Sequence, residues 1–442
     1  MGRLSKEITI SFDSLFNNIE IMQEDVSMYC NKNKKILLVV IILIIASFAV
    51  GFFTGRFDFN KKELAINNDN SSNIAEENVD VNDEKNNIES GINETKPEED
   101  SSSEVSTDDK IQSIINSMSI EEKVGQMFFV RCPETEQLNP ATEYHVGGYL
   151  LFARDFDGKS KEDVIANINS YQEASKIKLF IGVDEEGGTV TRVSRYQEFR
   201  SERFKSPRDL YAAGGMELIE SDSTEKCNLL TELGINVNYA PVCDVSTNPE
   251  DYMYSRSIGL SAEETGDFVA KIVKNMQVNG VGSVLKHFPG YGSNSDTHTG
   301  MSIDNRTIEE FENCDLIPFK RGIEEGAQCI LVSHNIITCM DDSMPSSLSI
   351  NVHNYLRNNM NYQGVIITDD LAMDAIQEYV DPEKAAIYAV KAGNDMIVCT
   401  DYKKQIPNVL QAVKSGEISE NTINESVRRI LEWKMQLLGN NI

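Results

Sequence analysis

Short apolar runs alternate with amphipathic stretches along the last three quarters of the chain. The amphipathic stretches place apolar residues at helical spacing, as in Lys161–Lys176, Ser261–Val278, Thr307–Gly326 and Pro382–Ala392. The apolar runs are Gln126–Val130, Val146–Phe152, Leu179–Val183, Val237–Val242, Gly282–Leu285, Cys329–Val332, Val365–Thr368 and Met396–Cys399. Such runs are typical of buried strands, so the pattern predicts strands that alternate with helices.

Eight strands that alternate with helices in about 330 residues predict an α/β fold, a (β/α)₈ barrel of TIM type over residues 109–442. The alternative is an open doubly wound sheet. No Gly-x-Gly-x-x-Gly follows any of the eight runs, which argues against a dinucleotide-binding site.

Polar residues follow several of the predicted strands directly. They are Asp184, Asp244, the pair Lys286-His287, His334 and Asp369. One acidic residue after a strand is often only the N-cap of the next helix. Polar groups at five strand ends indicate more, because a barrel gathers the carboxyl ends of its strands around one axis and its active sites lie there.

The N-terminal quarter has a different composition. Residues 1–35 form a short polar tail, and residues 36–55 carry no charge. Twenty apolar residues in a helix span the ~30 Å core of a bilayer, so residues 36–55 are predicted to be a transmembrane signal anchor. A cleaved signal peptide and a buried core helix are the alternatives. Lysine and arginine lie on both sides of the run, so charge does not fix the orientation.

An N-terminal anchor usually leaves a short tail in the cytoplasm and a large domain outside. We therefore expect a single-pass protein of the cell membrane with its globular domain extracellular. Residues 56–108 are rich in Asn, Ser, Asp and Glu, and residues 57–108 have a net charge of −11. Because such a segment has little apolar surface to bury, it is predicted to be a disordered acidic linker.

Charge and cysteine spacing narrow the possible partners. The net charge of −29 argues against nucleic acid, which requires clustered Lys and Arg. The eight cysteines include no Cys-x-x-Cys, and several lie within apolar runs, where free thiols are common. We expect no required disulfide, and the five histidines show no spacing typical of zinc ligands.

The stretch that follows the fifth strand carries candidate acid/base chemistry. Lys286-His287-Phe-Pro-Gly leads into a glycine-rich loop that holds Asp296 and His298. A histidine with a nearby carboxylate suits proton transfer, because its pKa of about 6.5 lies near neutral pH and the carboxylate can orient the ring. Asp-Thr-His on a loop is also compatible with a plain solvated turn.

The whole stretch resembles the signature of family-three glycoside hydrolases, in particular the β-N-acetylglucosaminidase branch of the muropeptide-recycling type. The resemblance covers almost all of residues 110–440. It implies that His298 is the acid/base, paired with Asp296 on a mobile loop. Position 291 differs from the family, because Tyr291 stands where histidine is usual, and this affects the expected loop shape.

The resemblance also assigns substrate-binding residues. Val-Asp184-Glu185-Glu-Gly-Gly resembles the family's Val-Asp-Gln-Glu-Gly-Gly, which implies that Asp184 holds sugar hydroxyls, with Glu185 in place of the common glutamine. Arg256, in Tyr-Ser-Arg-Ser-Ile-Gly, matches an arginine that contacts the substrate. Lys286 and His287 match the family's lysine-histidine pair.

The nucleophile is expected in Gly-Val-Ile-Ile-Thr-Asp369-Asp370, at the end of the seventh strand. Successive side chains of a strand point to opposite sides, so Asp369 and Asp370 cannot face a sugar equally. The resemblance selects Asp369, and Asp370 is interpreted as a cap of the following helix.

Together these features imply a retaining exo-β-N-acetylglucosaminidase that needs no metal or cofactor and acts on N-acetylglucosamine-containing cell-wall fragments or related glycans. A phosphorylase or a β-glucosidase of the same family is an alternative within enzymes. A catalytically silent glycan-binding barrel is the non-enzymatic alternative, because a fold alone does not fix function.

Overall fold

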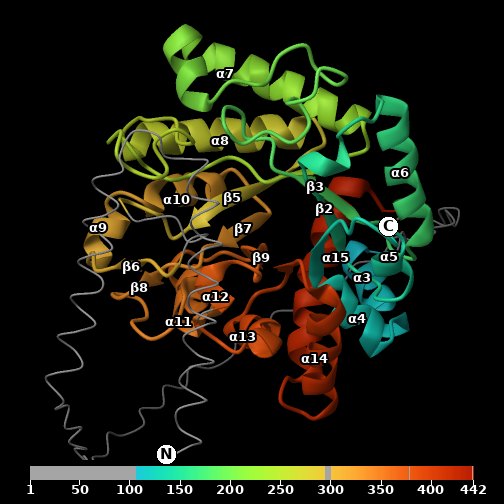
Figure 1. The fold of residues 1–442 in the computed structure, drawn as a ribbon. Helices are drawn as coiled ribbons and strands as arrows, with labels where there is room; N and C mark the ends of the chain where they lie inside the picture. The colour runs from blue at the N-terminus through green and yellow to red at the C-terminus, as the bar shows by residue number, and fades with distance from the viewer. Residues whose placement is uncertain (1–105, 294–299, 378, 441) are drawn as a thin grey trace, which may run out of the picture. The chain divides into compact units, whose positions relative to one another are not determined.

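A nearly closed barrel of eight parallel strands forms the centre of the domain (Figure 1). This computed structural model describes residues 106–293, 300–377, 379–440 and 442. The strands are β1 (Phe128–Arg131), β2 (Gly148–Leu151), β3 (Phe180–Val183), β4 (Val237–Asn238), β5 (Gly282–Phe288), β7 (Cys329–Val332), β9 (Val365–Thr368) and β10 (Ile397–Cys399).

The order of the strands shows how the barrel closes. It runs β10-β1-β2-β3-β4-β5-β7-β9, so strands that are consecutive in this set are neighbours. A parallel bridge between Ile367 and Met396 links β9 to the start of β10. The prediction of a parallel eight-stranded barrel is confirmed, and the open doubly wound sheet is wrong, since its strand order would reverse at a switch point.

Helices lie around the outside of the strands (Figure 1). Several begin with a serine whose hydroxyl accepts a backbone N–H while an acidic side chain three residues later binds back to the serine N–H, which satisfies two of the free donors of the first turn. The main helices are α3 (Thr107–Ser117), α4 (Ile120–Gln126), α6 (Lys161–Ala174), α7 (Pro207–Glu232), α8 (Ala262–Val278), α10 (Leu316–Glu324), α13 (Ala385–Ala392), α14 (Tyr402–Lys414) and α15 (Glu420–Leu438).

Some predicted elements differ in detail. The predicted helix Thr307–Gly326 is two helices, α9 (Ile308–Glu312) and α10, and the predicted helix Pro382–Ala392 begins with a 3₁₀ turn before α13. The fourth strand is short because Pro241, which has no N–H to donate, follows it closely. A small parallel pair, β6 (Ile303–Asp304) with β8 (Ile336–Ile337), was not predicted.

Packing inside the barrel requires glycine at one strand position. A Cβ atom on Gly182 of β3 would lie 2.7 Å from the Phe129 ring, closer than two carbon atoms can pack. The Phe129 ring also packs edge-on against Tyr239, with 5.5 Å between ring centroids. Large rings therefore fill the space that the glycine leaves.

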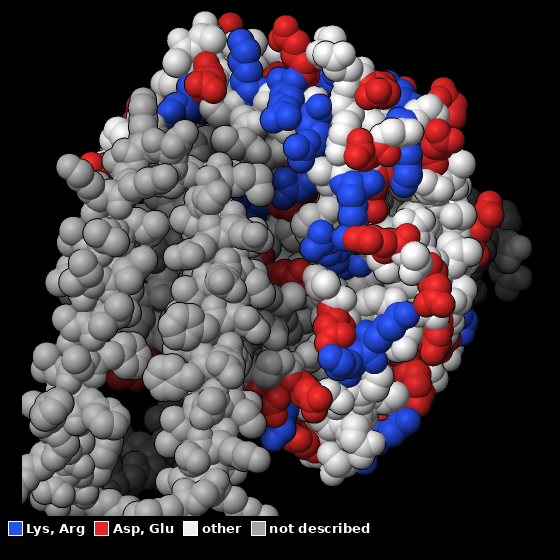
Figure 2. Space-filling view, viewed as in Figure 1, with Lys and Arg blue, Asp and Glu red and all other residues white. Residues whose placement is uncertain are grey.

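The N-terminal segments lie mostly outside the described residues. The tail 1–35, the anchor 36–55 and the linker up to residue 105 stay predictions. The described part begins with Ser106, which caps α3, and α3 packs against α15. Across the described ranges, no helix combines the length and apolar character that a membrane crossing requires. Figure 2 shows Lys and Arg side chains lying among Asp and Glu side chains on the described part of one face.

Candidate active site

The carboxyl ends of the strands surround one cavity of about 630 Å³. Five predicted site residues line it together, although they come from β3, the β4–α8 connection, β5 and β9. They are Asp184, Arg256, Lys286, His287 and Asp369. The remaining two predicted residues, Asp296 and His298, lie outside the described residues.

A buried carboxylate that was not predicted, Glu186, holds two of these residues. Arg256 donates two hydrogen bonds to it, at 2.6 Å from Nη2 to Oε1 and 3.0 Å from Nε to Oε2. Lys286 Nζ lies 2.6 Å from Glu186 Oε1. Burial by itself would raise the pKa of Glu186, but Arg256 and Lys286 outweigh burial and hold that pKa well below its usual range. Glu186 is therefore an anion that pairs with both cations.

Asp184 lies on the cavity side of this cluster. Lys286 Nζ donates to Asp184 Oδ1 at 2.7 Å, and Arg192 Nη2 lies 3.7 Å from Asp184 Oδ2. Lys286 thus joins two carboxylates, of which Asp184 is half-buried at the cavity and Glu186 is enclosed. A half-buried carboxylate held by cations can accept hydrogen bonds from hydroxyl groups.

His287 is fixed from both ring nitrogens. Its Nδ1 lies 2.8 Å from Asp244 Oδ2, and its Nε2 lies 3.1 Å from Arg256 Nη2. Because the arginine can only donate, Nε2 accepts and the ring proton is on Nδ1, directed at Asp244. Asp244 also accepts the N–H of Tyr291, whose ring packs edge-on against His287 with 5.3 Å between ring centroids. The tyrosine at 291 therefore supports the histidine side chain.

The predicted nucleophile Asp369 follows β9. The N–H of Asp370 donates to Asp369 Oδ1 at 2.8 Å. Asp370 is not the cap of a helix, as the sequence had suggested, because α12 (Asp374–Gln377) begins four residues later. Its carboxylate instead accepts the N–H of Ala372 at 3.0 Å and the hydroxyl of Thr400 at 2.6 Å, and so ties this turn to the end of β10.

The neighbouring Glu185 has no access to the cavity. It is fully buried and accepts the N–H groups of Arg192, Val193 and Ser194 together with the Ser194 hydroxyl. Its role is to hold the loop that carries Arg192. The three acidic residues after β3 therefore have different roles: Asp184 faces the cavity, Glu185 holds a loop, and Glu186 pairs with Arg256 and Lys286.

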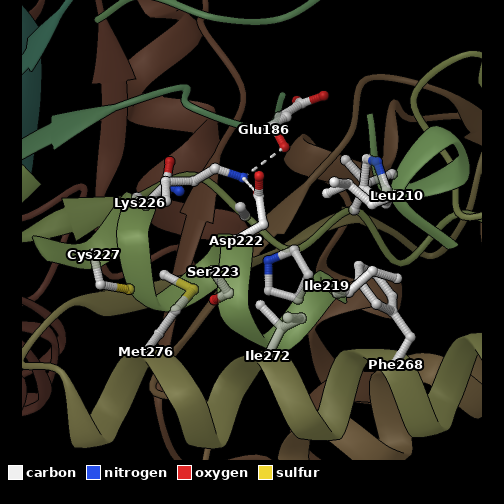
Figure 3. A pocket seen from close by; sticks show the side chains of 15 residues that line it. Glu186, Leu210, Ile219, Asp222, Ser223, Lys226, Cys227, Phe268, Ile272 and Met276 are labelled. Atoms are coloured by element: carbon white, nitrogen blue, oxygen red, sulfur yellow. Dashed lines mark hydrogen bonds and ion pairs between the residues drawn. The ribbon is translucent and has the colours of Figure 1, made fainter. Parts of the chain in front are cut away.

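Side chains of α7 support the backbone of Glu186 from outside the barrel (Figure 3). Lys226 of α7 donates to the backbone carbonyl of Glu186 at 3.1 Å and pairs with Asp222 at 3.3 Å. The small cavity beside them, about 40 Å³ in volume, is lined largely by apolar side chains of α7 and α8, among them Ile219, Phe268 and Met276. It has room for about one water molecule, so it is a packing gap rather than a binding site.

Sequence reasoning missed Glu186 and gave Asp244 no role. Both follow buried strands, which is a usable signal, and Glu186 lies two residues after Asp184. Their partners, however, come from other strands and loops far along the chain, so the pairing could not be deduced from local pattern.

The comparisons with known proteins agree with this geometry. The family model described as the glycosyl hydrolase family 3 N-terminal domain matches residues 119–433. The chain belongs to glycosyl hydrolase family 3. The match spans all eight barrel strands and every site residue named above, so the resemblance to this family is confirmed.

Proteins named beta-hexosaminidase are similar to this chain. Beta-hexosaminidase A of Pseudoalteromonas piscicida is 28% identical over 345 residues, which cover 69% of this chain and 55% of that protein. Beta-hexosaminidase LpqI of Mycobacterium tuberculosis is 28% identical over 330 residues, which cover 72% of this chain and 83% of that protein.

A solved structure of a family 3 enzyme is also similar to this chain. The family 3 β-N-acetylglucosaminidase of Paenibacillus sp. FPU-7 superimposes with a TM-score of 0.68 at 30% identity, covering 73% of this chain and 64% of that one. This chain therefore spans a little over half of the Pseudoalteromonas relative and just under two thirds of the Paenibacillus structure.

We expect Glu186→Gln to destabilise the fold by about 3–5 kcal/mol at pH 7, because removing one partner of a buried ion cluster leaves Arg256 without its carboxylate partner and Lys286 with Asp184 alone. The folded-state pKa of Glu186 is lowered, so its stabilising contribution is present above its unfolded pKa of about 4.3 and is lost as the pH falls below it. Wild-type protein should therefore lose more free energy of unfolding between pH 7 and pH 3 than the variant. Urea unfolding at several pH values measures both effects.

The matched control is Glu217→Gln on α7, which removes an exposed carboxylate. It should leave the free energy of unfolding and its pH dependence nearly unchanged. A Glu186→Gln protein as stable as wild type at pH 7 would show that the two cations do not depend on this anion.

Proposed function

We propose that the protein is a retaining exo-β-N-acetylglucosaminidase that removes terminal N-acetylglucosamine from cell-wall fragments or related glycans. The observation that carries the proposal is the position of Asp369 in the same cavity as Asp184, Arg256, Lys286 and His287. Membership of family 3 and the names of its relatives, beta-hexosaminidase and β-N-acetylglucosaminidase, support the substrate class.

Asp369 is the nucleophile in the proposed first step. Its Oδ1 is held by the Asp370 N–H, and a carboxylate oxygen attacks the anomeric carbon. A bond from that oxygen to the carbon forms while the bond from the carbon to the leaving oxygen breaks. His298, oriented by Asp296, protonates the leaving oxygen.

The second step returns the enzyme to its starting state. His298 takes a proton from water, the water oxygen attacks the anomeric carbon, and Asp369 leaves. Two displacements at one carbon restore the original β configuration. Neither step draws on a metal or a redox cofactor.

Asp184, Arg256, Lys286 and His287 are proposed to bind the sugar hydroxyls. Hydrogen bonds to charged groups are stronger than those between neutral groups, and ion pairs within the wall of the cavity keep these side chains in place. The sugar therefore meets donors and acceptors that are already oriented, which reduces the loss of entropy on binding.

An aryl β-N-acetylglucosaminide should be cleaved with retention, and Asp369→Ala should lower kcat/KM by about 10⁴-fold or more, equivalent to at least about 5 kcal/mol of transition-state stabilisation. The reason is that the covalent intermediate cannot form without this carboxylate. NMR of the first-formed anomer reports retention, and initial rates report the loss.

Asp374→Asn is the matched control, because Asp374 is an exposed carboxylate that lines the same cavity. It should retain activity within a few-fold. Full activity of Asp369→Ala would remove Asp369 as nucleophile. Parallel assays with and without inorganic phosphate separate hydrolysis from the phosphorylase alternative, since only phosphorolysis yields a sugar 1-phosphate.

His298→Ala should keep much of its activity on a dinitrophenyl glycoside and lose about 10²- to 10⁴-fold on a natural disaccharide, because general acid catalysis matters most for a poor leaving group. Rates are compared as kcat/KM, or as the pre-steady-state burst, since the second step uses the same histidine as base.

Asp296→Ala should show the same dependence on leaving group more weakly, because Asp296 acts through the imidazole. Equal losses of activity on good and poor leaving groups would indicate a folding or binding defect. They would support the interpretation of Asp296-Thr297-His298 as an ordinary turn.

We further propose that residues 36–55 anchor the protein in the cell membrane, with residues 1–35 cytoplasmic and the barrel outside. The support is the uncharged run of twenty residues in the sequence, followed by the acidic linker.

The full-length chain should remain in the membrane fraction after carbonate washing, and a variant without residues 36–55 should not. Protease added to intact protoplasts should remove the barrel domain if it is extracellular. Full-length protein in the supernatant of the carbonate wash would contradict the anchor, and protection from protease would contradict the orientation.

A further inference from the structure

His334 lies behind the cavity, two residues after the end of β7, and is fully buried. Its Nε2 is 3.0 Å from the backbone carbonyl of Asp370, and its Nδ1 is 2.7 Å from the hydroxyl of Ser347. The described residues that line the cavity do not include His334. It therefore contacts the peptide chain that carries the nucleophile, not the substrate.

The two contacts fix where the histidine carries its proton. A carbonyl oxygen can only accept, so Nε2 bears the hydrogen and donates it to Asp370, and in the neutral ring Nδ1 then accepts from the Ser347 hydroxyl. Ser347 is itself held, because its N–H donates to Ser333 at 3.0 Å and its carbonyl accepts from Asn394 at 2.7 Å. The ring cannot turn without breaking these bonds.

Asp370 is the residue through which this support reaches Asp369. Its carbonyl accepts from His334, its carboxylate accepts from Ala372 and Thr400, and its N–H donates to Asp369 Oδ1. Residue 370 is therefore fixed by its carbonyl and side chain, and its N–H is the group left to fix the nucleophile.

We propose that His334 is a positioning residue for the nucleophile Asp369. By holding the Asp370 backbone, it keeps the Asp370 N–H on Oδ1 and so sets the angle at which the Asp369 carboxylate meets the anomeric carbon. The inference rests on the proposed function, because it assumes that Asp369 attacks the sugar.

Loss of this support should slow the attack of Asp369 on the anomeric carbon and should not change how tightly the sugar binds. A displacement of a reacting group by about 1 Å can lower a rate by about 10²-fold. The sugar hydroxyls meet Asp184, Arg256, Lys286 and His287, and the structure shows no bond from His334 to any of these four among the described residues. Loss of His334 should therefore lower kcat/KM and leave the affinity for N-acetylglucosamine unchanged.

Three variants of the full-length protein test whether His334 positions the Asp370 backbone or only fills space. His334→Gln places an amide N–H at about the reach of Nε2 and should stay within a few-fold of wild type in kcat/KM on a dinitrophenyl β-N-acetylglucosaminide. His334→Asn has an amide too short for Asp370 and should lose about 10- to 100-fold, as should His334→Ala. Titration calorimetry with N-acetylglucosamine should give one dissociation constant for all of them.

His353→Ala is the matched control, since His353 is another buried histidine, on α11 (Ile350–Asn354), whose Nδ1 donates to a backbone carbonyl away from the cavity. It should lose stability without the selective loss of kcat/KM. If His334→Ala does not fold, the comparison of Gln with Asn decides.

Equal kcat/KM for the Gln and Asn variants would overturn the inference, and so would losses in sugar affinity that match the losses in kcat/KM. A wild-type protein without activity on any β-N-acetylglucosaminide would overturn the proposed function itself. An active wild type with an unaffected His334→Ala would overturn the positioning role alone.

Discussion

One buried carboxylate, Glu186, contacts both cations beside the cavity, and Asp184 supplies a second negative charge to Lys286. Moving a lone charge out of water is costly, and the 2.6 Å contacts to Glu186 lower that cost for both Arg256 and Lys286. The same contacts join β3, the β4–α8 connection and β5. One ion cluster thus compensates the charges beside the cavity and holds three segments of the barrel together.

Support from outside the cavity follows a common pattern at two strand ends. Lys226 donates to the carbonyl of Glu186, and His334 donates to the carbonyl of Asp370. In both cases a side chain outside the proposed sugar contacts holds a backbone carbonyl: that of Glu186, whose carboxylate pairs with Arg256 and Lys286, and that of Asp370, whose N–H binds Asp369. The residues that orient Arg256, Lys286 and Asp369 are therefore themselves held through their main chain.

The barrel could be predicted because its strands are short, mostly apolar runs that alternate with amphipathic helices. Asp184, Lys286 and Asp369 could be found for a related reason, since each follows such a run directly. Arg256 could not be found this way, because it lies on a loop without a periodic pattern, and only the family resemblance pointed to it. The roles of Glu186, Asp244 and His334 depend on Arg256 and Lys286, on His287 and on Asp370 respectively, and these partners lie between 36 and 100 positions away. Local pattern carries no information about such pairs. Asp370 was misinterpreted because a tight turn separates it from α12.

Glu185 stands where glutamine is common in the family, and its carboxylate holds a neighbouring loop. All four hydrogen-bond partners of its carboxylate are donors, three of them backbone N–H groups that cannot reverse. A glutamine in this place would turn its own NH₂ group toward at least one of these donors. Residue 185 and the loop that contains Arg192 to Ser194 must therefore be compatible with each other. Exchanging this loop between family members, in evolution or by grafting, should succeed only when residue 185 is exchanged with it.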